Sequence, residues 1–286
     1  MQKKKKQTLP EDERKIMSTL GYKKLHYPKS RVATFDVGKI GNNKHHIAGF
    51  VEIDVTGARK KIKDLRKEKR ISFYSWFIKT VSDVVSSQPL SHGLMDNRKR
   101  IFVFEDIDIA MPIERNVNGE KVPLALLIKK VNEKSISEIY SEIEKAKNQV
   151  ISDEGDFVLG EKKSRFMMNL FYSLPQKIRM FFWKKILYNP FKAKESMGTV
   201  IITSVSGQIN FSGWILPKSM HNLCLGLGSI SKKPWVVNNK IEIREILHLT
   251  ILFDHDVIDG APAARFINKL VKYLEKSYGI ENSSII

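Results

Sequence analysis

The stretch "FDHDVIDGAPAARF", residues 253–266, places ionisable side chains where an apolar run gives way to a helical pattern. The apolar run before it reads as a buried strand, and apolar residues recur at helical spacing after it. His255 and Asp259 therefore lie at a strand end, where open α/β architectures usually place catalytic groups. Histidine titrates near neutral pH and can act as a general base, and Gly260 permits a close backbone approach. On this short pattern alone, a histidine packed at an ordinary turn is the simpler interpretation.

The composition favours a large intracellular domain. The chain has 286 residues, of which 42% are hydrophobic, so it can bury a sizeable core. Cys224 is the single cysteine, which excludes a disulfide framework and a cysteine-based zinc site and suits a reducing compartment. The N-terminus has no apolar signal core, and no window approaches the ~18 uncharged apolar residues of a membrane span. We therefore expect a soluble, cytoplasmic protein.

The charge balance is strongly basic, with 49 Lys+Arg against 31 Asp+Glu and a net charge of +18. Such a surface attracts nucleic acid, anionic lipid or a polyphosphate cofactor, although a lysine-rich composition with a solvated face fits equally well. We find no recognised fold signature of a nucleic-acid-binding protein, and so we expect no nucleic-acid partner. The "GLGS" at 226–229 lacks the third glycine of a dinucleotide loop. Asp106 and Asp108 have no further acidic cluster beside them, and we expect no metal site.

Hydrophobic periodicity predicts an order of strands and helices along the chain. Thr56 is the expected N-cap of the first helix, Ser135 and Glu138 have the spacing of a capping box, and Asn118-Gly119 signals a turn. Residues 1–28 read as a basic arm before a single domain at 29–286. Strands are expected at 46–55, within 100–132, at 196–215 and 222–230, and at 240–253 as one bent strand or two; helices are expected at 56–70, 72–89, 135–148 and 262–275.

The stretch "FDHDVIDGAPAARFINKL" resembles the signature of the catalytic domain of the dihydrolipoyl acyltransferases of 2-oxoacid dehydrogenase complexes. This family shares its fold with chloramphenicol acetyltransferase. Other stretches resemble the family in the family's own order, over roughly residues 30–276. The resemblance implies an α+β fold, an α/β two-layer sandwich in which helices cover a mixed β-sheet. The stretches are "HHIAGFVEIDVTGARKKIKDLR", "DIDIAMPIERNVNGEKVPLALLIKKVNEKSISEIYSEI", "MGTVIITSVSG" and "LCLGLGSISKKP".

The resemblance implies a role for individual residues. His255 matches the family's general base, which removes the proton from a thiol as the sulfur attacks a thioester carbonyl. Asp259 matches an aspartate that pairs with an arginine and holds the base-bearing loop, and Arg31 is the candidate partner. The family's oxyanion-stabilising serine aligns with Thr203, whose hydroxyl can donate the same hydrogen bond. A shift of the alignment by one residue would give that role to Ser204.

The resemblance also implies substrates and an assembly. Ser229, in the strand that resembles the one near the active-site channel, and Gly260 are expected to contact substrate. Coenzyme A or acyl-CoA is the expected substrate, with no covalently bound cofactor, and its polyphosphate suits the basic surface. In the family, the histidine loop of one subunit faces the hydroxyl-bearing strand of its neighbour. A homotrimer, or a higher assembly of trimers, is therefore expected.

Two departures from the family bear on function. Asp256 stands where the family usually has arginine, and its negative charge is expected to raise the pKa of His255 and to disfavour an anionic substrate contact. No part of the chain resembles a lipoyl domain or a subunit-binding domain. We therefore do not expect the chain to serve as the ordinary core of a pyruvate dehydrogenase complex.

A third departure is a basic and hydrophobic insertion at about 158–195, where the family has a shorter connection. Residues 166–191 contain no acidic side chain, and their lysines and arginines alternate with aromatic and aliphatic residues. Such a segment can lie on an anionic membrane surface. It can equally pack on a neighbouring subunit or cover an acyl tunnel.

The sequence thus supports two hypotheses. The first is a stand-alone acyltransferase that moves an acyl group between a thioester, acyl-CoA above all, and a thiol, hydroxyl or amine acceptor. The second is a non-catalytic trimeric scaffold that retains the acyltransferase fold. His255, Asp259 and Gly260 favour the first, whereas Thr203 and Asp256 leave room for the second.

Overall fold

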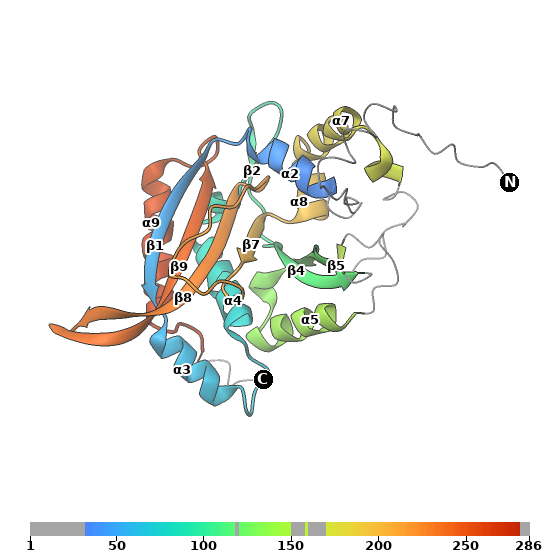
Figure 1. Ribbon diagram of the computed structural model, residues 1–286. Coiled ribbons are helices and arrows are strands. Elements are labelled where there is room, and N and C mark those ends of the chain that lie inside the picture. The colour runs from blue at the N-terminus through green and yellow to red at the C-terminus, as the bar shows by residue number, and fades with distance from the viewer. Residues whose placement is uncertain (1–31, 118–119, 150–157, 160–169, 281–286) are drawn as a thin grey trace, which may run out of the picture.

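The computed structural model describes residues 32–117, 120–149, 158–159 and 170–280 (Figure 1). The expected basic arm, Arg31 and the Asn118-Gly119 turn lie outside these residues.

The described strands form one large mixed sheet in the order β1-β9-β8-β7-β4-β5-β6. Strand β7 pairs in parallel with β4 and β8, and β5 pairs in parallel with β6, whereas the other pairs are antiparallel. This arrangement confirms the predicted mixed sheet. The strands are β1 (His46–Asp54), β4 (Ile109–Val117), β5 (Glu120–Ile128), β6 (Val158–Leu159), β7 (Val200–Ser204), β8 (Leu223–Val237) and β9 (Lys240–Asp254), and a separate small sheet pairs β2 (Leu94–Met95) with β3 (Ile101–Phe102).

Four helices pack with the sheet around a single hydrophobic core. Helix α9 has Phe266, Leu270 and Leu274 at 0% exposure, and α4 buries Trp76 and Phe77 equally completely. Their apolar residues recur three and four positions apart, so each helix buries one continuous stripe. The helices are α3 (Thr56–Leu65), α4 (Phe73–Ser87), α5 (Ile136–Asn148) and α9 (Gly260–Glu275), and the short 3-10 helices are Pro89–His92 and Val131–Glu133.

Local capping explains where these helices begin. The predicted capping box of α5 is confirmed, because the Ser135 backbone N–H donates to the Glu138 carboxylate at 2.7 Å and the Ser135 hydroxyl caps in return. Thr56 is the first residue of α3, and Val55 occupies the N-cap position, so that prediction was wrong. The Thr56 hydroxyl instead accepts the backbone N–H of Glu245 at 2.8 Å. This bond ties the start of α3 to β9.

One strand prediction needs correction, and the choice left open at 240–253 is decided. Residues 196–215 contain only the short strand β7, because the chain after Ser204 leaves the sheet and crosses β8 closely. A Cβ atom added to Gly228 would lie 2.3 Å from the Gly213 carbonyl oxygen, so only glycine fits this crossing. The stretch at 240–254 is one strand, and its partner β8 absorbs a register shift between Leu227 and Ile230.

A further layer lies at one end of the sheet, where α2 (Val32–Gly41), α7 (Gln176–Leu187) and α8 (Pro190–Met197) gather (Figure 1). Asp36 and Arg179 form a fully buried ion pair between α2 and α7, with N···O distances of 2.7 and 2.9 Å. The indole N–H of Trp183 donates to the same carboxylate at 3.2 Å. Within the described residues, no helix is long and apolar enough to cross a membrane.

Candidate active site

The turn that carries His255, the predicted general base, begins where β9 ends. The His255 backbone N–H donates to the carbonyl of His45 at 3.0 Å, and the Asp254 carbonyl accepts the N–H of Val257 at 3.0 Å. The imidazole of His255 is exposed and has no hydrogen-bond partner among the described residues. Its ring is therefore open to a substrate within one chain.

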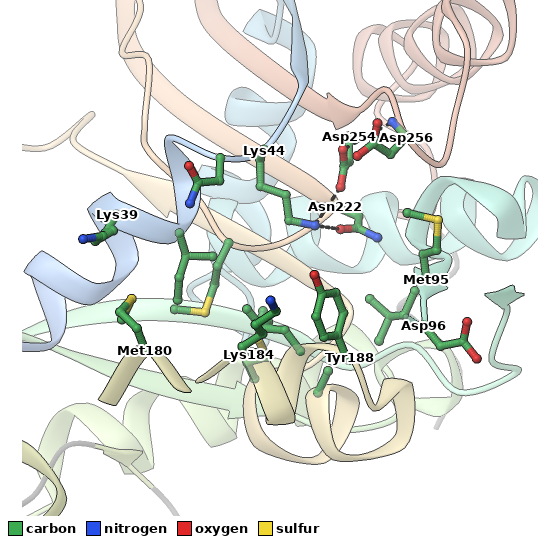
Figure 2. Close-up of a pocket in the computed structure, with 17 residues that line it drawn as sticks. Lys39, Lys44, Met95, Asp96, Met180, Lys184, Tyr188, Asn222, Asp254 and Asp256 are labelled. Carbon is green, nitrogen blue, oxygen red and sulfur yellow. Dashed lines mark hydrogen bonds and ion pairs between the residues drawn. The ribbon is translucent and has the colours of Figure 1, made fainter. Parts of the chain in front are cut away.

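Buried polar groups hold this turn from beneath. Asp254 is 2% exposed, and its carboxylate accepts a hydrogen bond from the Lys44 ammonium at 2.7 Å. The same ammonium donates to the Asn222 side-chain oxygen at 2.6 Å (Figure 2). A paired charge of this kind in a buried site fixes the backbone around it. The position of His255 is thus set by residues on β9 and in the loops before β1 and β8.

Asp256 does not lie against the imidazole of His255. Its carboxylate pairs with Nδ1 of His45 at 2.9 Å. This hydrogen bond and the attraction of the charge raise the pKa of His45 above its usual value. The backbone bond between His255 and His45 brings the His45 imidazole to this carboxylate, so the hydrogen-bond partner of Asp256 is a second histidine beside the turn.

Asp259 occupies the N-cap position of α9, but its side chain makes no capping hydrogen bond. The residue is exposed, and its expected partner Arg31 lies outside the described residues. Gly260 is the first residue of α9, and a Cβ atom added there would meet nothing within 4 Å. The expected close approach at Gly260 is thus absent among the described residues of one chain.

The two candidate hydroxyls of β7 differ in their surroundings. Ser204 Oγ lies 2.8 Å from the Tyr74 hydroxyl and 3.0 Å from Ser206 Oγ. Thr203 is half-buried, and its hydroxyl makes no hydrogen bond to a described residue. Thr203 is therefore the hydroxyl of this pair that remains available to a ligand.

A single chain keeps Thr203 and His255 apart. Thr203 pairs with Gly226, and Gly226 pairs with Thr250 on β9, so two strand spacings of ~4.8 Å separate Thr203 from β9. His255 follows Thr250 by five positions, which adds about 16 Å along the strand at ~3.3 Å per residue. The two Cα atoms are hence roughly 19 Å apart, whereas a catalytic hydrogen bond needs about 3 Å.

Ser229 is not at the surface where a substrate-binding role was expected. It is 3% exposed, accepts the Gly213 backbone N–H at 2.8 Å and lies 3.0 Å from Nδ1 of His248. Nε2 of His248 in turn lies 3.2 Å from the Glu52 carboxylate. The sequence contains no local pattern that predicts this network of polar side chains, because the side chains lie on three different strands. Ser229 therefore links strands β8, β9 and β1 rather than facing solvent.

A family model for the 2-oxoacid dehydrogenases acyltransferase (catalytic domain) matches residues 40–154 and 189–280, well over half of the chain. The chain belongs to this family. The matched ranges include His255, Asp259 and Thr203, whereas the unmatched interval contains the whole of α7. The family model thus covers the candidate site residues and leaves α7 unmatched.

Two curated relatives illustrate the similarity. The dihydrolipoyllysine-residue succinyltransferase component of the mitochondrial 2-oxoglutarate dehydrogenase complex of Bos taurus is 25% identical over 238 residues, which are 79% of this chain and 43% of the relative. The dihydrolipoyllysine-residue acetyltransferase component of the pyruvate dehydrogenase complex of Buchnera aphidicola is 28% identical over 255 residues, 82% of this chain and 54% of the relative. The chain thus spans about half the length of these relatives.

Solved structures show the same fold. A probable dihydrolipoamide acetyltransferase from Listeria monocytogenes superposes with a TM-score of 0.63 at 20% identity, covering 91% of this chain and 97% of that one. The cubic core of a pyruvate dehydrogenase multienzyme complex gives a TM-score of 0.65 at 16% identity, with coverages of 94% and 97%. These structures therefore confirm the predicted fold class, and the family model confirms the predicted family.

Proposed function

We propose that this protein transfers an acyl group between a thioester, acyl-CoA above all, and a thiol, hydroxyl or amine acceptor. The observation that carries the proposal is the open imidazole of His255 on a turn that Asp254 and Lys44 anchor, in a chain of the acyltransferase family. A general base must be both accessible and held in place, and this arrangement meets both conditions. The same proposal places the protein in the cytoplasm, where its single cysteine stays reduced.

A solved relative supports the assignment of roles. The structural and enzymatic study of the Azotobacter vinelandii dihydrolipoamide acetyltransferase concerns a serine, a histidine and an asparagine in its catalytic mechanism. The spacing of that serine and histidine equals the spacing of Thr203 and His255, and the asparagine follows its histidine as Asp259 follows His255. This correspondence favours Thr203 over Ser204 as the oxyanion donor and Asp259 as a residue that orients the base.

The proposed reaction balances with these groups alone. His255 takes the proton of the acceptor thiol while the sulfur attacks the thioester carbonyl carbon. The carbonyl oxygen becomes an oxyanion, to which the Thr203 hydroxyl donates a hydrogen bond. The intermediate then collapses, the coenzyme A sulfur leaves, and that sulfur takes the proton back from His255. The acyl group ends on the acceptor, and both side chains return to their starting states.

We propose that the complete site forms between subunits of a homotrimer. The separation of roughly 19 Å within one chain rules out direct cooperation of Thr203 and His255 there. A neighbouring copy can supply the missing partner at each interface. A cubic core is the assembly named for one solved relative, and it supports a further assembly of trimers here.

An exposed apolar arm supports such contacts. The paired ends of β8 and β9 extend beyond the rest of the sheet (Figure 1). Val236, Ile241 and Ile243 on this arm are 70%, 77% and 76% exposed. Val236 lies directly opposite Ile241, so the two side chains share one face of the arm. Apolar surface of this kind usually marks a protein contact.

The primary test measures the release of free thiol from acyl-CoA with and without acceptors. The His255→Ala variant should fold normally and lose about 10²- to 10⁴-fold in turnover, the usual contribution of a general base. His45→Ala is the matched control, because His45 is an exposed histidine beside the same turn. Full turnover by the His255→Ala variant would refute the assignment, and a trimer that transfers no acyl group would support the scaffold hypothesis.

A mixing experiment tests the shared site. Inactive His255→Ala chains and inactive Thr203→Ala chains, unfolded and refolded together, should recover part of the activity. Some interfaces would then combine an intact histidine with an intact threonine. A fully active monomer would contradict the interface model. A trimer without recovery would show that Thr203 is the wrong hydroxyl.

We also propose that the outer face of α7 contacts an anionic membrane surface. Ile178, Phe181 and Phe182 are 44%, 66% and 42% exposed, and exposed Lys177 and Lys185 lie on the same helix. An aromatic surface with flanking cations suits the boundary between lipid head groups and acyl chains. Binding to anionic but not neutral vesicles, weakened by salt, is expected in co-sedimentation. Absence of binding at every salt concentration would favour packing against another subunit.

A further inference from the structure

A cavity of about 480 Å³ lies beside the base-bearing turn. Its volume falls within the usual range of small-molecule sites. Helices α2, α7 and α8, strand β2 and the loops before β1 and β8 form its walls (Figure 2). Helix α7, which forms one wall of this cavity, lies in the interval that the family model does not match.

The cavity has an adaptable apolar lining. Methionine dominates it, and the unbranched thioether side chain adjusts to ligands of different shape. Leu94, Ala193 and Met220 are buried, whereas the other three residues are partly exposed to the cavity or solvent. A straight hydrocarbon chain is the ligand group that suits such a lining. The apolar residues that carry this argument are Leu94, Met95, Met180, Ala193, Met197 and Met220.

The carboxylates around the cavity are already paired with basic side chains. Asp254 pairs with Lys44 at 2.7 Å, and Asp96 pairs with Arg100 at 2.7 Å. Asp256 pairs with His45. Asp254 and Asp96 therefore contribute little net negative charge to the cavity, and a hydrogen bond to His45 holds Asp256.

Two lysines at the mouth of the cavity are not neutralised by a carboxylate among the described residues. Lys39 on α2 and Lys184 on α7 line the cavity and are exposed to solvent. Neither has a carboxylate partner within the described parts of the chain. The positive charge of this mouth therefore favours an anionic group.

We propose that this cavity binds an amphipathic anion, a molecule with a straight apolar chain and an anionic head. The chain lies among the methionines, and the head lies between Lys39 and Lys184. A fatty carboxylate and a phosphate-headed lipid share this chemistry. The site is separate from the proposed transfer reaction, although Asp254 and Asp256 connect its wall to the base-bearing turn.

The test measures calorimetric binding of dodecanoate and dodecyl phosphate below their micelle concentrations, without coenzyme A. Binding with a stoichiometry of one is expected, and the stronger probe identifies the source of the head group. Acetate, which lacks the chain, should not bind measurably. Dodecyltrimethylammonium, which reverses the charge, should bind roughly tenfold more weakly or worse. Equal binding of the cationic probe, or no binding of either anion, would overturn the proposal.

Variants locate the ligand. Lys39→Gln and Lys184→Gln should each weaken the binding of the anions about threefold to fivefold, as expected for exposed charges. Lys185→Gln is the matched control, because Lys185 is exposed on the same helix and does not line the cavity. An equal effect of all three variants would mean that general surface charge, rather than this site, attracts the anions, and it would overturn the assignment.

Filling the cavity gives an independent measurement. Met180→Trp should abolish binding, whereas Ile178→Trp, on the same helix but outside the lining, should leave it unchanged. Thermal unfolding checks that both variants retain the fold. Undiminished binding by Met180→Trp would place the ligand elsewhere. The His255→Ala variant should bind dodecanoate normally, so failure of the catalytic proposal and failure of this one give different results.

Discussion

Helices α9 and α7 follow opposite rules of burial. In α9 the apolar residues Phe266, Leu270 and Leu274 are completely buried. In α7 the side chain of Arg179 is buried, whereas Phe181 is 66% exposed. Hydrophobic burial therefore holds α9 in place, whereas an ion pair with Asp36 anchors α7.

The two helices therefore differ in how much of their apolar surface packs against the core. A helix that buries its apolar stripe exposes little apolar surface to a binding partner. A helix anchored by the polar contacts of Arg179 and Trp183 with Asp36 keeps its exposed aromatic face for another surface, and it leaves space beneath it for a cavity. The shared catalytic domain and the α2–α7 layer should therefore respond differently to the same kinds of change.

Acidification should give the largest effect, and it should act through the catalytic domain. Burial lowers the pKa of His92 and His221 to about 4, whereas the unfolded chain titrates near 6.5. Between these values the unfolded state binds more protons, so stability falls as pH falls. The loss by pH 4 is on the order of 3 kcal/mol for each histidine. Urea unfolding at pH 7, 5.5 and 4.5 measures it.

Substitution of these histidines checks the cause of the acid effect. The free energy of unfolding of His221→Gln and His92→Gln should depend less steeply on pH than that of the wild type. His45→Gln is the comparison, since this exposed histidine has a raised pKa and should produce no such flattening. An unchanged slope in both buried-site variants would assign the acid sensitivity to other groups.

Truncation of a core aromatic residue is the next largest effect. Phe266→Ala should lower the free energy of unfolding by about 3–5 kcal/mol, because it opens a cavity against Phe253, whose ring lies 5.4 Å away. The loss should appear throughout the molecule, as a single shifted transition in urea. A loss confined to α9 would show that this helix is less integrated than its burial indicates.

Removal of the Asp36 carboxylate should lower stability by a comparable amount, but the effect should be confined to a smaller part of the molecule. Asp36→Ala leaves the buried guanidinium of Arg179 without its partner, which costs roughly 3 kcal/mol. Amide hydrogen exchange should accelerate in α2 and α7 and remain slow in α9. The double variant Asp36→Ala/Arg179→Met should restore much of the protection, because it removes the unpaired charge. Equal acceleration in α9 would contradict the proposed independence of this layer.

The smallest effect is expected at the exposed face of α7. Phe181→Ser should change the free energy of unfolding by no more than about 0.5 kcal/mol, as is usual for surface positions. It should nevertheless reduce binding to anionic vesicles. A loss similar to that of Phe266→Ala would show that Phe181 supports the fold rather than a partner.

The sequence was sufficient for features that depend on local spacing. The stripe of α9, the capping box of α5 and the strand before His255 all follow from neighbours within one or two turns. The partner of Asp256, the burial of Ser229 and the ion pair of α7 could not be predicted in this way. Asp256 and His45 are 211 positions apart, and Asp36 and Arg179 are 143 apart, so only the folded sheet brings them together. Asp36 stands alone among the basic residues of α2 and α7, so no local pattern predicted its partner.

The distance between Thr203 and His255 has a kinetic consequence. If each site takes its oxyanion donor and its general base from different chains, an isolated chain has no catalytic activity. Specific activity would then depend on protein concentration even at saturating substrate, and it would fall on dilution as the subunits separate. Mixing wild-type chains with one defective variant would also lower the activity. The loss would depend on how often intact chains neighbour each other, and not simply on the number of intact chains.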